Sequence, residues 1–360
     1  MKNKFPYKWE LKNSIFTKDK GKVFSCFACG GGSTMGYKLA GFDVLGCNEI
    51  DPKMMAVYKL NHNPKYSYCE PIQTFKLRKD LPKELYELDI LDGSPPCSSF
   101  STAGNREKDW GKEKKFREGQ AEQVLDTLFF DFIDLAKELQ PKIVIAENVK
   151  GLLMGKAKEY VKKIYEDFEN AGYYVQHHLL NASKMGIPQR RERVFFIAIR
   201  KDLVKNLVNE NDSLTNMPKL ILDFNENPIT FGEFYQEGID DRPASKGKMF
   251  EYWQNRQKGD KSFCDTMKRT YGIERCFTNK YLYNDIVPMT YTSNSDVIYL
   301  FDEFRKPNKY ESCCIGSFPL DYNFENVKYN YLIGMSVPPV MTAQIVSEIY
   351  EQWGILFKKN

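Results

Sequence analysis

The sequence predicts an α/β protein built on an open, mostly parallel, doubly wound sheet, with a smaller domain inserted into it. In the first 200 residues, short apolar runs alternate with segments of helical periodicity, which is typical of a parallel sheet covered by helices. Polar or glycine-rich residues follow several of these runs, as ligand-binding residues do at the carboxyl ends of parallel strands. The alternation stops between residues 203 and 326. We therefore predict one domain from 1–202 plus 327–360 and a second from 203–326.

Short apolar runs in the first half are the predicted strands. They lie at 23–27, 43–47, 88–92, 142–146, 173–180 and 193–200. Helices are expected after Gly30–Gly32 as far as Ala40, over 123–139, from about Tyr160 until Gly172, and over about 341–353. The helix at 123–139 is predicted because its apolar residues recur with a period near 3.6, and glycine is a usual helix-ending residue, as at Gly172.

The composition is that of a soluble protein in a reducing compartment. Of 360 residues, 42% are apolar, which is ample for a core. The N-terminus has no apolar signal-peptide run, and no later segment approaches the roughly 18 apolar residues of a membrane span. Nine cysteines, an odd number, favour free thiols over a disulfide framework. We therefore expect a cytoplasmic protein.

The net charge of +4 conceals two segments of opposite sign in the predicted insertion. Residues 242–280 carry ten Lys and Arg against four acids, a net of +6, whereas residues 210–241 have a net of −7. Such a basic segment is expected to face nucleic acid, with Arg256, Lys268 and Arg269 as candidate contacts. Aromatic residues interleave the basic ones, and most of these are expected in the core of the insertion.

A glycine run after the first strand and an acid after the second predict a nucleoside-binding site. Gly30–Gly32 let backbone N–H groups approach a ligand, and Glu49, 19 residues after Gly30, suits a ribose diol. The dinucleotide fingerprint G-x-G-x-x-G fails, because Met35 stands where the third glycine belongs. S-adenosylmethionine therefore fits better than NAD, which argues against a nicotinamide dehydrogenase. The alternative is a tight turn that binds nothing.

Three further groups follow predicted strands or lie between them. Cys97, after Pro95 and Pro96, is a candidate nucleophile, although a lone cysteine is more often a small buried hydrophobe. Glu147 and Asn148 could form an acid–base site, or Glu147 could cap a helix. The basic run Gln189–Arg193 could equally be a solvated turn.

These motifs occur in an order and spacing that strongly resemble the DNA (cytosine-5) methyltransferase family. The resemblance runs from about Val23 to Trp353, with the insertion unmatched. It is carried by Phe27–Gly32 (FACGGG), Asn48–Asp51 (NEID), Pro96-Cys97, Glu147–Val149 (ENV), Gln189–Arg193 (QRRER) and Gly334–Pro339 (GMSVPP). The resemblance implies a Rossmann-like methyltransferase fold with an inserted target-recognition domain that binds double-stranded DNA.

The resemblance also implies a reaction and its residues. Cys97 would add as a thiolate to C6 of a flipped-out cytosine, Glu147 would hold or protonate N3, and Arg193 would hold O2. Arg191 and Asn148 would support this site. S-adenosylmethionine would donate the methyl group to C5, leaving S-adenosylhomocysteine.

Further residues acquire roles from the same resemblance. The cofactor would contact Phe27, Gly30, Gly31, Gly32, Glu49, Ile50, Glu70 and Ser336. DNA would contact Ser99, Arg106, Gln189, Arg256, Lys268 and Arg269. The basic segment 98–119 would be a loop that closes over the flipped nucleotide. We expect a monomer without a metal, and the sequence leaves open whether a cognate restriction endonuclease exists.

The sequence departs from the family pattern at three positions. Cys29 and Met335 stand where the family usually has glycine and asparagine, and Cys314 replaces an arginine that organises the second domain. These departures keep a catalytically impaired DNA-binding relative as an alternative. The tRNA-methylating branch of the family is another, although a long insertion with its own basic segment favours duplex DNA.

Overall fold

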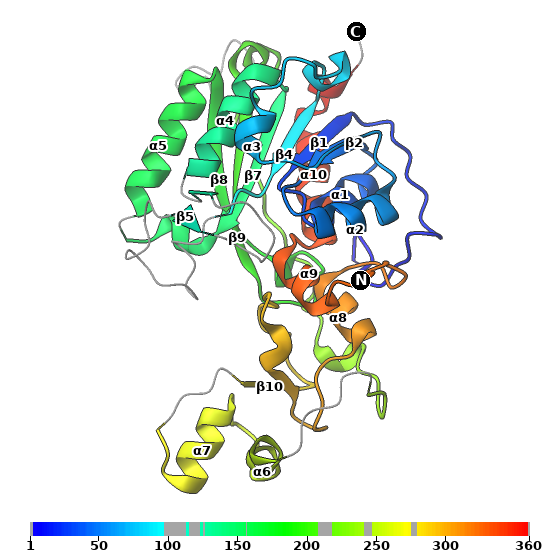
Figure 1. Ribbon diagram of the computed structural model, residues 1–360, viewed down its shortest axis with the longest axis vertical. Helices are drawn as coiled ribbons and strands as arrows, with labels where there is room; N and C mark the ends of the chain where they lie inside the picture. Colours follow the sequence, from blue (N-terminus) through cyan, green and yellow to red (C-terminus); the bar gives the residue numbers. More distant parts are fainter. Residues whose placement is uncertain are drawn as a thin grey trace. The chain divides into compact units, whose positions relative to one another are not determined.

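The computed structural model describes residues 3–96, 113–114, 123–124, 127–155, 157–207, 218–240, 247–274 and 279–358 (Figure 1). The chain forms two compact units. The sheet unit comprises Ile15–Asn181, Glu192–Phe224 and Met341–Asn360, and the second unit comprises Met1–Ser14, Ala182–Arg191 and Asn225–Val340. These divisions differ from the predicted boundaries, since the N-terminal residues, Ala182–Arg191 and 327–340 belong to the second unit.

The sheet unit contains a seven-stranded sheet in the order β3-β2-β1-β4-β7-β9-β8. Its strands are β1 (Lys22–Cys26), β2 (Asp43–Asn48), β3 (Tyr66–Tyr68), β4 (Ile90–Gly93), β7 (Ile143–Val149), β8 (Tyr173–Asn181) and β9 (Glu192–Arg200). The first five in the spatial order are parallel, whereas β9 runs antiparallel to both β7 and β8. The predicted mostly parallel α/β sheet is therefore confirmed.

Helices cover the sheet on both sides. In Figure 1, α3, α4 and α5 lie on one side of it and α1 and α2 on the other. The helices are α1 (Gly32–Leu39), α2 (Pro52–His62), α3 (Ile72–Phe75), α4 (Leu128–Leu139), α5 (Ala157–Asn170) and α10 (Pro339–Trp353). Phe42, after α1, packs edge-on against Tyr350 of α10 at a ring distance of 6.1 Å. The predicted helices near 32–40, 160–170 and 341–353 are confirmed.

The apolar face of α4 forms much of the core, as its period predicts. Phe129 packs edge-on against Phe196 of β9 at 5.5 Å, and Phe132, Leu135 and Leu139 are also buried. The predicted start of this helix at Gln123 is wrong, because α4 begins at Leu128 and the backbone at Gln123–Val124 pairs as β6 with β5 (Glu113–Lys114). Helical periodicity alone could not locate this boundary.

The second unit has short elements joined by long irregular segments. They are α6 (Lys248–Gln254), α7 (Phe263–Tyr271), β10 (Lys280–Leu282), β11 (Ile298–Leu300), α8 (Lys309–Gly316) and α9 (Tyr329–Met335). A buried cluster of Tyr252, Phe263, Met267, Tyr281 and Tyr299 joins α6 and α7 to the β10–β11 pair. Of the described aromatics of the basic segment, Tyr252 and Phe263 are buried in this cluster and Trp253 packs against it, whereas Phe250 is half-buried and Tyr271 is 39% exposed.

A buried arginine organises the start of α8. Arg305 donates from both terminal nitrogens to the Glu311 carboxylate at 2.7 and 2.8 Å, and from Nε to Glu303. Glu311 also forms a capping box with Asn308. Cys314, where the family has arginine, is buried one turn later, and burial raises the pKa of its thiol to about 12. Arg305 is thus the buried guanidinium that holds Glu303 and Glu311 together at the start of α8.

One stretch, Tyr329–Phe357, is long and apolar enough to cross a membrane by length and composition. The expectation that no segment would approach this criterion is therefore wrong. However, 89% of its apolar window is buried inside the protein, as in the core helix of a soluble protein.

Candidate active site

The carboxyl ends of the parallel strands bring most of the predicted site residues to one edge of the sheet (Figure 1). The glycine loop follows β1, and Glu49 follows β2. Glu147 and Asn148 lie near the C-terminal end of β7. Because β9 is antiparallel to β7, its first residues meet the same edge, and Arg193 is paired with Val149. The structure thus brings Glu147 and Arg193 together from distant parts of the sequence.

Glu147 and Arg193 form an ion pair at this edge. Arg193 Nε lies 2.9 Å from Glu147 Oε1, and the two side chains are only 15% and 12% exposed. Charge-assisted hydrogen bonds of this kind fix both partners and are stronger than neutral ones. Since Glu147 lies within β7, the alternative that it caps a helix is wrong.

Asn148 ties β7 to the segment that leads to the candidate nucleophile. Its Nδ2 donates to the carbonyl of Pro95 at 3.2 Å, and its Oδ1 accepts from the backbone N–H of Val149 at 2.8 Å. The side chain is buried, so this contact is fixed in place. Cys97, Ser99 and Arg106, with the predicted closing loop at 98–119, lie outside the described residues apart from the backbone of 113–114.

Glu49 anchors the glycine loop from the end of β2. Its Oε2 accepts from the backbone N–H of Cys29 at 2.7 Å, and its Oε1 from that of Asp51 at 2.8 Å. Burial raises the pKa of the Glu49 carboxyl to about 6, although neighbouring backbone N–H groups oppose the rise. Ile50 follows it and is half-buried.

The departure at Cys29 has a definite conformational cost. Cys29 has φ +48°, in the left-handed region that glycine enters without penalty but that other residues populate rarely. Its backbone N–H still donates to Glu49. This hydrogen bond does not depend on the side chain at position 29, so the change from glycine to cysteine preserves it. Phe27 before it also has a positive φ, and its half-buried ring meets Phe132 edge-on at 6.2 Å.

His62 holds the other side of the same loop and was missed from the sequence. Its Nε2 lies 3.2 Å from the carbonyl oxygen of Gly30, while Lys38 Nζ donates to the His62 carbonyl at 3.2 Å. A Cβ added to Gly31, whose φ is +83°, would lie 2.2 Å from His62 Nε2. Burial, reinforced by Lys38, lowers the pKa of His62 to about 3, so the imidazole is neutral.

Glu70 lies just beyond β3, close to the end of β2. Asn48 Nδ2 donates to the Glu70 carbonyl at 2.8 Å, and Arg78 Nη1 pairs with the Glu70 carboxylate at 2.8 Å. Arg78 also pairs with Asp80 at 2.6 Å. The Glu70 carboxylate, for which an adenine contact is predicted, is thus oriented by Arg78.

Three predicted site residues are buried scaffold in the second unit. Gln189 donates to the Ile315 carbonyl and accepts from the Tyr291 N–H, so its predicted DNA contact conflicts with a side chain that is 1% exposed. Arg191 donates to the carbonyls of Tyr291, Gly334 and Ser336, and the Ser336 hydroxyl donates to Leu332 at 2.8 Å. The side chains of Gln189 and Arg191 are thus hydrogen-bonded to backbone groups of the second unit.

The three candidate DNA contacts differ sharply in accessibility. Arg256 stacks on Trp253, with Cζ 3.4 Å from the ring centroid, and donates to the Phe301 carbonyl, so it supports the core. Arg269 pairs with Asp260 at 2.7 Å. Lys268 is 70% exposed and pairs only at the surface, with Glu274 at 3.1 Å. Of the three, Lys268 is best placed to meet a phosphate.

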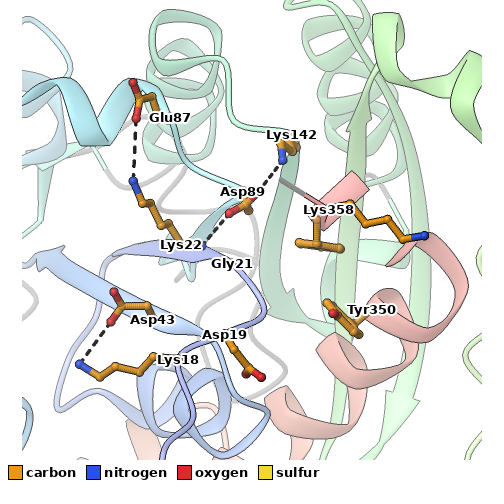
Figure 2. Close-up of a pocket in the computed structure, with 11 residues that line it drawn as sticks. Lys18, Asp19, Gly21, Lys22, Asp43, Glu87, Asp89, Lys142, Tyr350 and Lys358 are labelled. Atoms are coloured by element: carbon orange, nitrogen blue, oxygen red, sulfur yellow. Dashed lines mark hydrogen bonds and ion pairs between the residues drawn. The ribbon is translucent and has the colours of Figure 1, made fainter. Parts of the chain in front are cut away.

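A separate pocket of about 630 Å³ lies at the opposite edge of the sheet, where β1, β2, β4 and β7 begin (Figure 2). Six of its eight charged residues form ion pairs: Lys18 with Asp43 at 3.4 Å, Lys22 with Glu87 at 3.8 Å, and Lys142 with Asp89 at 2.7 Å. These pairs leave little net charge to bind an ionic ligand, so we assign no function to this pocket.

Comparisons with known proteins confirm the family resemblance. The family model described as C-5 cytosine-specific DNA methylase matches residues 21–351. The Type II methyltransferase M.FnuDI of Fusobacterium nucleatum is 38% identical over 182 residues, 51% of this chain and 48% of the relative. The Orphan methyltransferase M.SPRI of Bacillus phage SPR is 36% identical over 166 residues, 46% of this chain and 34% of the relative. The matched part of the chain thus spans half the length of these relatives or less.

A solved structure shares the fold. The crystal structure of a Spodoptera frugiperda DNMT2 mutant superposes with a TM-score of 0.61 and 18% sequence identity, covering 94% of this chain and 99% of that one. At this identity the likeness concerns the fold alone.

Proposed function

We propose that this chain, which belongs to the C-5 cytosine-specific DNA methylase family, transfers a methyl group from S-adenosylmethionine to C5 of a cytosine in double-stranded DNA. The observation that carries the proposal is the Glu147–Arg193 pair. It lies at the carboxyl edge of the sheet, and Asn148 next to it holds Pro95, two residues before Cys97. The acid and the arginine therefore share one edge of the sheet with Pro95, which precedes the candidate nucleophile by two residues in the sequence.

In the proposed reaction, the protein makes an unreactive carbon nucleophilic. The Cys97 thiolate forms a bond to C6 of the flipped cytosine, and the electrons of the C5–C6 double bond become available at C5. Glu147 donates a proton or a hydrogen bond at N3, which stabilises the charge that develops during this addition. Arg193 orients Glu147 and holds O2 of the base. After methylation, the C5 proton passes to solvent water and N3 returns its proton to Glu147. The electrons of the C5–H bond re-form the C5–C6 double bond, and Cys97 leaves C6 as the thiolate.

The residues at the glycine loop fit S-adenosylmethionine, which supplies an electrophilic methyl group when bound. Each carboxylate oxygen of Glu49 accepts one backbone N–H and retains a lone pair for a ribose hydroxyl. Gly30–Gly32 would lie against the methionine part, Phe27 and Ile50 against the adenine, and Glu70 near its amine. The Ser336 hydroxyl and N–H both donate to the Leu332 carbonyl, and its own carbonyl accepts from Arg191, so a cofactor contact by Ser336 is not part of the proposal.

We further propose that the second unit binds the DNA sequence and that the protein acts as a monomer in a bacterial or phage-infected cytoplasm. Lys268 is the side chain of its basic segment that we propose for a phosphate contact, since Arg256 and Arg269 are engaged within the unit. Relatives named Type II and Orphan methyltransferases both match the chain, so a restriction partner is not part of the proposal.

A covalent trapping experiment tests the proposal. The protein is incubated with tritiated S-adenosylmethionine and duplex DNA in which 5-fluorocytosine replaces cytosine, because fluorine at C5 blocks the final elimination. We expect a labelled protein–DNA adduct that survives denaturation, is lost in Cys97→Ser and persists in Cys69→Ser, a control at an exposed cysteine.

Other outcomes would contradict specific parts of the proposal. Label transfer that does not depend on Cys97 would refute the covalent mechanism. Labelling of tRNA and not of duplex DNA would assign the chain to the tRNA-methylating branch. DNA binding without any transfer would identify a catalytically impaired relative.

A further inference from the structure

A buried carboxylate that the proposed reaction does not use lies on β4, behind the glycine loop. Asp92 is 4% exposed, and its Oδ2 accepts from the hydroxyls of Ser25 and Ser33 at 2.7 Å each. Its Oδ1 accepts from the hydroxyl of Tyr37 at 3.1 Å. No lysine, arginine or histidine of the described residues pairs with it. Asp92 is therefore a buried acid held by neutral donors alone.

The position of Asp92 links it to both halves of the proposed site. It is in register with Ser25 on β1 and with Ile145 on β7, two residues before Glu147. Ser33 directly follows the last glycine of the loop and lies in the first turn of α1. Asp92 itself precedes Cys97 by five residues. Asp92 thus belongs to the strand that leads to the candidate nucleophile, and its carboxylate is bonded to Ser33 next to the glycine loop.

Burying an ionised carboxylate without a cationic partner lowers the stability of the folded protein, so we ask what function Asp92 could serve. Three hydroxyl donors offset part of the cost of taking a carboxylate out of water, but neutral hydrogen bonds do not cancel its charge. Burial, with the nearby Glu147, raises the pKa of Asp92 to about 6, while the hydroxyls oppose the rise. At pH 8 the group is still ionised, so it imposes a negative potential on the space in front of the loop.

We infer that Asp92 selects the charge of the bound cofactor, favouring the sulfonium cation of S-adenosylmethionine over the neutral thioether of S-adenosylhomocysteine. The inference rests on the proposed function of the glycine loop. The expected preference is roughly fivefold, the order of a screened attraction between unit charges that lie near each other without touching. Such a preference would favour exchange of the product for fresh cofactor.

Binding calorimetry on the full chain at pH 8 tests the inference. The dissociation constants of S-adenosylmethionine and S-adenosylhomocysteine are measured for the wild type, for Asp92→Asn and for Ser33→Ala. Asp92→Asn removes the charge at nearly constant shape, whereas Ser33→Ala removes one hydrogen bond and keeps the charge. We expect the preference for the cation to fall about fivefold in Asp92→Asn and to stay unchanged in Ser33→Ala.

The possible results separate this inference from the function on which it rests. Equal weakening of both ligands in Asp92→Asn would show that Asp92 is only structural and would overturn the inference alone. A wild type that binds neither ligand would overturn the proposed function and the inference with it. If Asp92→Asn does not fold by circular dichroism, Asp92→Ser provides a smaller neutral replacement beside Ser25 and Ser33, with the same expected loss of preference.

Discussion

Replacing His62 by glutamine should make the protein less sensitive to acid than the wild type. In the folded chain, Nε2 of His62 faces the Gly30 carbonyl and burial lowers the pKa of the imidazole to about 3. In the unfolded chain the pKa returns to about 6.5. Below about pH 6.5 the imidazole is therefore protonated in the unfolded state but not in the folded state. The free energy of unfolding thus decreases as the pH drops from about 6.5 towards 3.

The magnitude follows from these two pKa values. Each pH unit below about 6.5 costs about 1.4 kcal/mol, so lowering the pH from 7.5 to 5.0 should remove about 2 kcal/mol through His62. Glutamine can donate its amide N–H towards Gly30 but does not titrate. The carboxyls of Glu49 and Asp92, whose pKa values are raised to about 6, act in the opposite direction, because they increase the free energy of unfolding as the pH falls. They are present in both proteins, so their contribution cancels.

Urea unfolding followed by far-ultraviolet circular dichroism at pH 7.5 and pH 5.0 provides the measurement. The wild type should lose about 2 kcal/mol more than His62→Gln between the two pH values. His177→Gln is the matched control, because His177 is exposed and burial lowers its pKa to a smaller extent. Equal losses in the wild type and His62→Gln would refute the assignment of a buried, neutral His62.

Three further predictions concern the second unit and the glycine loop. Arg305→Met should lower the free energy of urea unfolding by about 3–5 kcal/mol, because it leaves a buried carboxylate without its cation; a loss below 1 kcal/mol would contradict this. Gly31→Ala should weaken S-adenosylhomocysteine binding at least tenfold in calorimetry, since its Cβ would lie 2.2 Å from His62 Nε2 and would displace the glycine loop. Unchanged affinity would show that the loop backbone can shift to accommodate the methyl group without loss of binding. Lys268→Gln should reduce the log–log salt slope of DNA binding by about 0.9, whereas Arg256→Gln should leave that slope unchanged and lower stability by about 1–2 kcal/mol; the reverse pattern would reassign the two side chains.

The sequence predicts the sheet well because its strands are buried and therefore continuously apolar. The runs at 23–27 and 142–146 correspond to β1 at Lys22–Cys26 and β7 at Ile143–Val149. The polar residues that end the second run remain paired with β9, so the strand extends through Glu147. Hydrophobicity could not show this extension, because Glu147 and Asn148 are polar and remain in the strand through their pairing with β9.

Short elements and the direction of charged side chains escaped prediction. β3 has only three residues, Tyr66–Tyr68, too few for a periodic pattern, and α2 was missed although Asp51 caps it ahead of Pro52. In the second unit, a segment charge of +6 predicts a basic surface, yet Arg256 turns inward onto Trp253. A count of charges carries no information on orientation, which is set by packing partners distant in the sequence.

The electrostatics of the glycine loop adds an independent argument about its ligand. Glu49 and Asp92 place two carboxylates beside the loop, while the nearby His62 is neutral. A pyrophosphate brought to this loop would meet like charge with no described arginine or lysine paired to either carboxylate, whereas a sulfonium would be attracted. The failed dinucleotide fingerprint, with Met35 in place of the third glycine, already favours S-adenosylmethionine over a pyrophosphate-containing cofactor. The two buried carboxylates disfavour it by charge. Glu49 was predicted from the sequence, whereas Asp92 was not, because its partners Ser25, Ser33 and Tyr37 lie 55 to 67 residues away.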